Sequence, residues 1–253
     1  MKPPRHDWLV PDWPAPANVR AFITTRNGGV SIGPHASFNL GLRADEDPQT
    51  VAQNRALLQQ HLPQTPKWLR QVHGTRVVDA DTIDPAQDSP QADASIARLT
   101  GTVCTVMVAD CLPLLFTNHA GTRVAAAHAG WRGLAGGVVA NTVQVLGDAG
   151  VRPAELLAYI GPGIGPGAFE VGRDVFDAFA TSDAAATSAF APHGPGKWLG
   201  DLFTLARRAL TRAGLPPQHI YGGGLCTYAD AARFYSYRRD KVTGRMAAFI
   251  WRQ

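Results

Sequence analysis

Three short segments of the sequence carry side chains that bind metal ions well. His73 precedes a glycine, Cys111 follows the carboxylate of Asp110, and His128 precedes the residues AGWRG. Two imidazoles and one thiolate suit zinc, and three protein ligands leave the fourth position for water, as catalytic zinc requires. Copper is compatible with the same donors. Because no two of these residues form a short ligand pair, the fold must assemble the site from three separate segments.

Each residue also fits a structural role. A lone histidine is more often a hydrogen-bonded structural residue than a ligand, and a free cysteine is among the most buried residue types. The proline at 113 breaks the apolar strand close to Cys111, which favours a site at that strand end. Asp110 is a candidate acid or base and equally a candidate for orienting the metal ligands.

Two further groups are candidates for binding phosphate or another anion. Arg132 falls in the first turn of a predicted helix, where a cation opposes the helix dipole and therefore needs a reason such as a bound anion. Backbone N–H groups at the start of that helix add donors. Arg26 lies close to Gly28 and Gly29, and this group offers a guanidinium together with glycine-rich backbone donors.

Hydrophobic periodicity indicates the elements that must position these residues. Strands are predicted for residues 102–109, 113–117, 123–128, 156–160, 220–225 and 246–251. Helices are predicted for residues 48–62 with Asp47 as N-cap, from Trp131 to Gly147 or Gly150, and for residues 202–213 between the cap Asp201 and Gly214. Residues 84–93 have the composition of a surface loop. His128 therefore ends a strand just before a helix begins.

The irregular order of helices and strands predicts an α+β fold with mixed sheets. A regular parallel winding needs a helix between nearly every pair of strands, and this sequence does not supply one. With 253 residues, of which 45% are hydrophobic and 17% charged, the chain lies in the range of globular proteins. One domain spanning residues 1–253 is the expected organisation.

Composition excludes several classes of partner. The 24 basic and 20 acidic residues give a net charge of +4 and are scattered apart from a short basic cluster near residues 233–241, which is too little for nucleic-acid binding. No segment resembles a signal peptide or reaches the roughly 20 apolar residues needed to span a bilayer. Three cysteines without such a signal argue against a disulfide framework. Cys104 lies within an apolar strand, so we predict that it is a core residue. We therefore expect a cytoplasmic protein without a membrane partner.

A series of segments along nearly the whole chain resembles the signature of the multicopper polyphenol oxidase (laccase-like) family, also called the purine nucleoside phosphorylase or peptidoglycan editing factor family. The segments that carry the resemblance are Thr25-Arg26-Asn27-Gly28-Gly29-Val30-Ser31, Phe38-Asn39-Leu40-Gly41, Asn54-Arg55, Gln71-Val72-His73-Gly74, Ala92-Asp93-Ala94, Asp110-Cys111-Leu112-Pro113, His128-Ala129-Gly130-Trp131-Arg132-Gly133, Ile160-Gly161-Pro162, Phe169-Glu170-Val171-Gly172, Cys226-Thr227 and Phe234-Tyr235-Ser236-Tyr237-Arg238-Arg239. So many ordered segments rarely coincide by chance.

The resemblance implies a single domain of layered α/β/β/α type, with zinc held by His73, Cys111 and His128. It also implies a monomeric enzyme whose partners are purine nucleosides and phosphate. Its reactions are expected to be phosphorolysis of adenosine, inosine, guanosine and methylthioadenosine, and hydrolytic deamination of adenosine. Composition and spacing by themselves indicate none of these substrates.

Three other functions use the same residues. Cys111 with His73 or His128 as its base is the pattern of an amidase, which one family name links to peptidoglycan precursors. The older name implies copper-dependent polyphenol oxidation, although one three-ligand site and eight histidines fall short of the several coppers of a laccase. A zinc-stabilised binding module is a non-enzymatic alternative, but structural zinc usually has four protein ligands.

Overall fold

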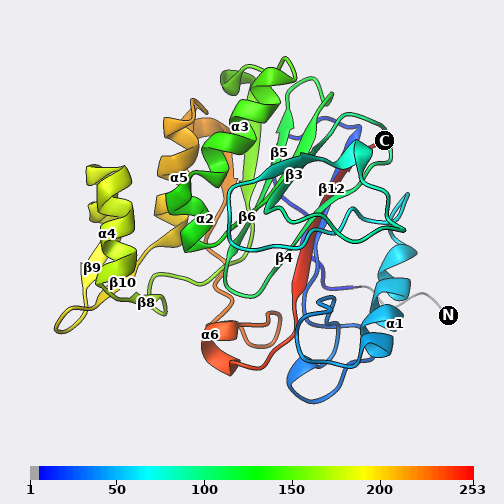
Figure 1. Ribbon diagram of the computed structural model, residues 1–253, viewed down its shortest axis with the longest axis horizontal. Helices are drawn as coiled ribbons and strands as arrows, with labels where there is room; N and C mark the ends of the chain where they lie inside the picture. Colours follow the sequence, from blue (N-terminus) through cyan, green and yellow to red (C-terminus); the bar gives the residue numbers. More distant parts are fainter. Residues whose placement is uncertain (1–5) are drawn as a thin grey trace.

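The computed structural model describes residues 6–253 (Figure 1). Its largest sheet has six strands in the order β11-β7-β5-β6-β3-β2. The strands are β2 (Val77–Asp79), β3 (Ala94–Ala97), β5 (Leu112–Asn118), β6 (Val124–Ala129), β7 (Leu156–Ile160) and β11 (Ile220–Gly222). The outer pairs β11/β7 and β2/β3 are parallel, whereas the inner pairs are antiparallel. The sheet is therefore mixed, as the irregular order of elements predicts.

Two smaller antiparallel sheets accompany it. One has the order β1-β12-β4 and consists of β1 (Val19–Ile23), β12 (Met246–Arg252) and β4 (Cys104–Val108), so the first and last strands of the sequence pair in it. The other has the order β8-β10-β9, formed by β8 (Glu170–Val171), β10 (Trp198–Gly200) and β9 (Phe190–Pro192). In Figure 1 this small sheet lies beside α4 (Arg173–Ser182), at the edge of the molecule far from the C-terminus.

Side chains alternate between the two faces of each strand, so the six-stranded sheet packs against helices on one face and against the three-stranded sheet on the other. Leu114 and Phe116 of β5 face the cluster that includes residues of α2 (Trp131–Gly136), α3 (Val138–Asp148) and α5 (Leu202–Arg212). Leu115, on the opposite face, packs with Ala248 and Ile250 of β12 between the two sheets.

A third cluster closes the far side of the small antiparallel sheet. Phe249 of β12 points away from the large sheet and packs with Phe22 and with Leu58 of α1 (Pro48–Gln59). Figure 1 accordingly shows α1 on the opposite side of the molecule from α2 and α5. The resulting order is helices, six-stranded sheet, three-stranded sheet and helix, which confirms the predicted α/β/β/α layers of an α+β domain.

Most predicted elements are confirmed, with shifts at their ends. Asp47 caps α1 by accepting a hydrogen bond from the Thr50 N–H, and Asp201 caps α5 in the same way. The prediction of one continuous helix after Gly130 is wrong, because Gly137 adopts a φ of 99° and separates α2 from α3. The strand predicted for residues 220–225 ends at Gly222. A four-residue helix, α6 (Tyr237–Asp240), precedes β12.

Within residues 6–253, no helix has both the length and the apolar character needed to cross a bilayer. The cysteines of this part of the chain are free thiols. Cys104 is fully buried in β4, and burial raises the pKa of its thiol to about 12. Its predicted role as a small core residue is therefore confirmed.

We expect Phe116→Ala to lower the free energy of unfolding by about 3 to 5 kcal/mol, because the substitution leaves a cavity at a fully buried position of the central strand. Urea unfolding measures the change. The control is Ile32→Ala, at a side chain 81% exposed, which we expect to change stability by less than about 0.5 kcal/mol. Equal effects of the two substitutions would contradict the assignment of the core.

Candidate metal centre

The fold brings His73, Cys111 and His128 together. One ligand atom of each lies within 4.8 Å of the others, and the Cys111 sulfur is 3.7 Å from the His73 Nε2. Tetrahedral zinc, about 2.3 Å from sulfur and about 2.0 Å from nitrogen, separates those two atoms by roughly 3.5 Å. Both the spacing and the chemistry of the donors therefore fit a zinc ion. Among residues 6–253, this is the one cluster of three or more such groups.

Strand pairing accounts for two of the three ligands. His128 lies on β6 with its side chain on the same face as Val124 and Ala126, toward the three-stranded sheet. It pairs in register with Pro113, and Leu112 pairs with Ala129, so Cys111, which directly precedes β5, lies beside Gly130. A Cβ atom on Gly130 would lie 2.8 Å from the Cys111 sulfur and 2.8 Å from the His73 ring. The glycine is therefore required for the ligands to converge.

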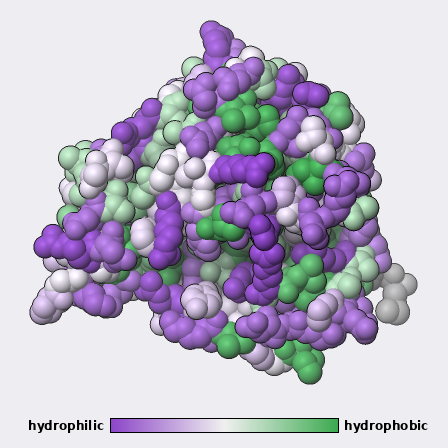
Figure 2. Space-filling view, in the orientation of Figure 1, coloured by the Kyte–Doolittle hydropathy of each residue, from purple (hydrophilic) through white to green (hydrophobic). Residues whose placement is uncertain are grey.

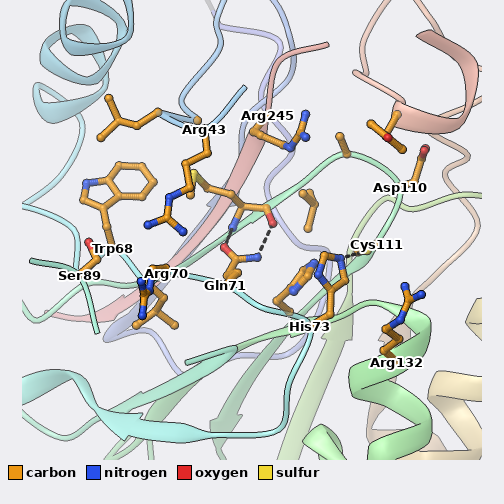
Figure 3. Close-up of a pocket in the computed structure, with 18 of the residues that line it drawn as sticks. Arg43, Trp68, Arg70, Gln71, His73, Ser89, Asp110, Cys111, Arg132 and Arg245 are labelled. Carbon is orange, nitrogen blue, oxygen red and sulfur yellow. Dashed lines mark hydrogen bonds between the residues drawn. The ribbon is translucent and has the colours of Figure 1, made fainter. Parts of the chain in front are cut away.

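His73 reaches the cluster from a loop outside the large sheet. The side chain of Gln71 anchors this loop to β4, because it donates to the Met107 carbonyl at 2.8 Å and accepts from the Met107 N–H at 2.7 Å (Figure 3). His73 adopts a φ of 60° and Asp110 a φ of 98°, conformations that L-residues rarely occupy. Such strain persists only where surrounding contacts enforce it, and both positions adjoin the metal centre.

The carboxylate of Asp93 holds the His73 loop and the His128 ring together. It accepts hydrogen bonds from the N–H groups of Val72, His73 and Gly74 at 2.7 to 3.1 Å, and from the His128 Nδ1 at 2.9 Å. Burial raises the pKa of Asp93, but these hydrogen bonds outweigh burial and lower it below the usual range. The ionised carboxylate fixes the proton on Nδ1 and leaves Nε2 of His128 for the metal.

Sequence reasoning assigned no role to Asp93, although its segment belongs to the resemblance. A signal was present, because a carboxylate directly before a buried strand needs a partner. The side chain is fully buried, and its partners come from two distant segments. Only the folded chain identifies those partners.

The charges of Cys111 and His128 are coupled. Burial raises the pKa of the Cys111 thiol, but attraction to His128 and hydrogen bonds to both histidines outweigh it and lower the pKa to about 6. Burial lowers the pKa of His128, but the Cys111 thiolate and Asp93 raise it to about 9. These shifts favour the charged forms of both groups, a thiolate beside an imidazolium. A cation that binds there replaces the His128 proton.

The cluster opens into a cavity of about 890 Å³. Hydrophilic side chains predominate on the face of the molecule seen in Figure 2. Two features of the lining stand out, namely its arginines and its aromatic rings. The arginines are Arg43, Arg55, Arg70, Arg132, Arg238 and Arg245, and the aromatic residues are Trp68, Trp131, Phe169 and Tyr237. Asp88 and Asp110 are the carboxylates among the lining residues. A cavity of this kind favours an anionic ligand with a planar ring.

Of the residues that the sequence suggested beside the metal ligands, two lie at the cavity. Asp110 and Arg132 both line the cavity. Asp110 accepts hydrogen bonds from the Thr227 hydroxyl and the Arg238 backbone N–H, both at 2.6 Å. Arg132 is exposed, and its guanidinium lies 4.3 Å from the centre of the Trp131 ring. Asp110 is thus held in place on both oxygens, whereas Arg132 keeps its donors available.

Arg26, Gly28 and Gly29 do not line the cavity. The Arg26 guanidinium donates to the carbonyls of Ala36 and Ala231, and the N–H groups of both glycines donate to the Ser37 hydroxyl. These donors stabilise the loop in which they lie. The structure therefore places this group, which the sequence suggested as a phosphate-binding group, outside the cavity of the metal centre.

We expect Asp93→Asn to weaken zinc binding by about 10- to 100-fold, because the loss of charge frees both the His128 ring and the His73 loop. Competition with a chelator measures the affinity. Asp88→Asn, at an exposed carboxylate of the same cavity, is the matched control. Unfolding of the metal-free variants separates a metal effect from a loss of fold. Unchanged zinc affinity in Asp93→Asn would refute this role.

Nearly the whole chain is similar in sequence to known proteins. Residues 20–253 match the model of the family described as multi-copper polyphenol oxidoreductase laccase. A protein of Pseudomonas aeruginosa named purine nucleoside phosphorylase is 54% identical over 247 residues, which covers 97% of this chain and 98% of the relative. The purine nucleoside phosphorylase YfiH of Escherichia coli is 51% identical over 245 residues, covering 96% and 98%.

Comparison with solved structures supports the fold. The crystal structure of a Neisseria meningitidis protein of the DUF152 family superposes with a TM-score of 0.91 at 51% identity, covering 97% of this chain and 99% of that one. These matches extend well beyond the residues of the metal centre. The chain therefore belongs to the multi-copper polyphenol oxidoreductase laccase family.

Proposed function

We propose that the protein is a zinc-dependent purine nucleoside enzyme. Its reactions would be phosphorolysis of adenosine, inosine, guanosine and methylthioadenosine, and hydrolytic deamination of adenosine. The observation that carries this proposal is the convergence of His73, Cys111 and His128 on a cavity lined by arginines and aromatic rings. The names of the relatives support the same reaction class.

Zinc suits this site better than copper for this chemistry. Three protein ligands with an open fourth position are the pattern of catalytic zinc. When bound, zinc supplies a Lewis acid and lowers the pKa of water. Reduction of dioxygen by a laccase uses several coppers, and residues 6–253 contain one three-ligand cluster. The name of the family is therefore a weaker guide to the metal than the donor set.

Phosphorolysis requires the protein to hold phosphate beside the ribose. A phosphate oxygen forms a bond to C1′, the bond from C1′ to N9 of the purine breaks, and the proton of the hydrogen phosphate passes to the purine. Arg132 is the candidate from the sequence for holding the phosphate. Arg245 lies near Asp110 and Cys111, whose charges partly offset the lowering of its pKa by burial. Two guanidiniums near the ligands thus supply charge-assisted hydrogen bonds to the anion.

The aromatic residues of the cavity provide surfaces for the purine. Trp131 begins α2 directly beside the ligand cluster. Phe169 and Tyr237 also line the cavity, and the Arg238 guanidinium lies 5.5 Å from the centre of the Phe169 ring. Flat rings stack on such surfaces and bury apolar area. The family resemblance implies a monomer, and we propose that a single chain is sufficient for activity.

Deamination differs from phosphorolysis in its nucleophile. Water adds to C6 of adenosine and ammonia leaves, so a residue must move protons near that carbon. Asp110 is our candidate, either through direct proton transfer or as a positioning residue for Arg238 and Thr227. Its place in the cavity wall supports either role.

One contact also favours a second candidate function, an amidase acting on peptidoglycan precursors. The Cys111 sulfur lies 3.7 Å from the His73 Nε2, which is the arrangement of a cysteine nucleophile and its base. The nearby His128, oriented by Asp93, gives the cluster a third donor that a Cys/His pair does not need. Three converging donors therefore make zinc binding the better-supported function.

We expect the purified protein to bind about one zinc ion per chain, and Cys111→Ala and His128→Ala to lose most of it, because each removes one of three ligands. Elemental analysis measures the content. Cys104→Ala is the matched control, since this cysteine is fully buried in β4 and should leave the metal content unchanged. Full zinc retention in both ligand variants would disprove the site.

The two reactions can be distinguished experimentally, because phosphorolysis requires phosphate and deamination does not. With adenosine and the zinc-loaded protein, we expect inosine to form without phosphate, and free base with ribose 1-phosphate to form only when phosphate is present. Chromatography of the products measures both. Base release without phosphate would contradict the mechanism. The absence of both reactions, with turnover of a muropeptide precursor, would favour the amidase.

Arg132→Ala tests the proposed phosphate contact within the same assay. The loss of a charge-assisted hydrogen bond, worth roughly 1.5 to 3 kcal/mol, should depress phosphorolysis more than deamination. Arg152→Ala, at an exposed arginine that pairs with Glu155 outside the cavity, is the control. Equal losses of both reactions in Arg132→Ala would instead indicate a structural role or a role in binding the nucleoside.

A further inference from the structure

The cavity extends well beyond the metal centre. Figure 3 shows His73, Cys111 and Arg132 at one end and Trp68, Arg43 and Arg70 at the other, with Gln71 between them. Arg55 belongs to the second end, because its guanidinium lies 3.9 Å from the centre of the Trp68 ring. We call the group Arg43, Arg55, Trp68 and Arg70 the distal cluster.

None of the six arginines that line the cavity lies within 4.0 Å of a carboxylate of residues 6–253. Within residues 6–253, seven arginines lie within 4.0 Å of a carboxylate, namely Arg98, Arg152, Arg173, Arg208, Arg212, Arg233 and Arg239. The six that line the cavity are absent from that set, and so are six arginines outside the cavity that donate to backbone carbonyls instead, namely Arg20, Arg26, Arg76, Arg123, Arg207 and Arg252. A concentration of unpaired cations in one concave site raises the local positive potential and attracts anions.

The three distal arginines have different amounts of free hydrogen-bonding capacity. Arg55 is half-buried and donates to the Leu40 carbonyl through two nitrogens, so it mainly supports the Trp68 ring. Arg70 donates one hydrogen bond to the Gln91 side chain. Arg43 is exposed, and its guanidinium donates no hydrogen bond to any of residues 6–253. Arg43 and Arg70 therefore keep donors for a ligand.

This charge exceeds what a neutral nucleoside and one phosphate require. Arg132, Arg238 and Arg245 already line the cavity together with the metal ligands. At the distal end the exposed carboxylate of Asp88 is the acidic group of the lining, against three guanidiniums. A second anionic group on the ligand would balance the excess, and the rim position of Arg43 and Arg70 makes it accessible from solvent.

We propose that the distal cluster is a second anion subsite, which binds a phosphate ester carried by the nucleoside, so that the cavity accepts purine nucleotides as well as nucleosides. This inference rests on the proposed nucleoside function. The ligand would reach from the metal centre past Gln71 to Arg43 and Arg70, and Trp68, supported by Arg55, would form a wall of the distal end.

Calorimetry of the zinc-loaded chain in phosphate-free buffer tests the subsite. Inosine and inosine 5′-monophosphate are the probes, because inosine has no 6-amino group to lose and phosphorolysis requires phosphate. We expect the nucleotide to bind at least about tenfold more tightly than the nucleoside, and the doubly substituted variant Arg43→Gln/Arg70→Gln to abolish that difference. The doubly substituted variant Arg20→Gln/Arg152→Gln, at two exposed arginines outside the cavity, is the charge-matched control and should retain the difference.

Three results would overturn the subsite. The first is equal affinity for nucleotide and nucleoside, and the second is a nucleotide preference that persists in the double variant. The third comes from titration with inorganic phosphate alone: if the double variant weakens it as much as it weakens nucleotide binding, the distal cluster binds free phosphate.

Parallel assays of inosine phosphorolysis separate this inference from the function on which it rests. Turnover of inosine without any preference for the nucleotide would remove the subsite alone. Absence of both inosine binding and turnover would remove the proposed function as well.

Discussion

The Asp93 carboxylate connects two parts of the metal centre that are far apart in the sequence. Its hydrogen bonds reach the three backbone N–H groups of residues 72–74 on one side and the His128 ring on the other. A fully buried carboxylate is stable only when donors surround it, so burial and orientation depend on each other. The positions of two of the three candidate ligands follow from this single group.

The layers of the fold explain why the ligands meet where they do. His128 points from β6 toward the three-stranded sheet, and Gln71 anchors the His73 loop to β4 of that same sheet. Cys111 enters at the start of β5, beside the glycine that precedes α2. The site therefore lies at the junction of two sheets, where strand ends supply side chains and loops supply the wall. Such junctions are common places for ligand pockets.

Six arginines and two carboxylates give the lining of the cavity a positive charge. Around it lie arginines without carboxylate partners, whereas arginines on the outer helices, such as Arg208 with Asp183, form ion pairs. An exposed ion pair contributes little to stability, but an unpaired guanidinium in a concave site contributes to recognition. The gathering of six arginines around one cavity thus carries information about function that the net charge of +4 does not.

The sequence by itself determined the donor chemistry and most of the local structure. Periodicity located β5, β6, β7, β12, α1 and α5, because alternation and helical spacing are set by the local backbone geometry. Tertiary structure alone decided three other points. It placed Asp93 between the ligands, it removed Arg26, Gly28 and Gly29 from the cavity, and it gathered six arginines around it. The physical reason is that a hydrogen-bond donor or a charge acts on whatever lies within a few ångströms of it, and those neighbours come from segments whose separation in the sequence gives no measure of their distance in space.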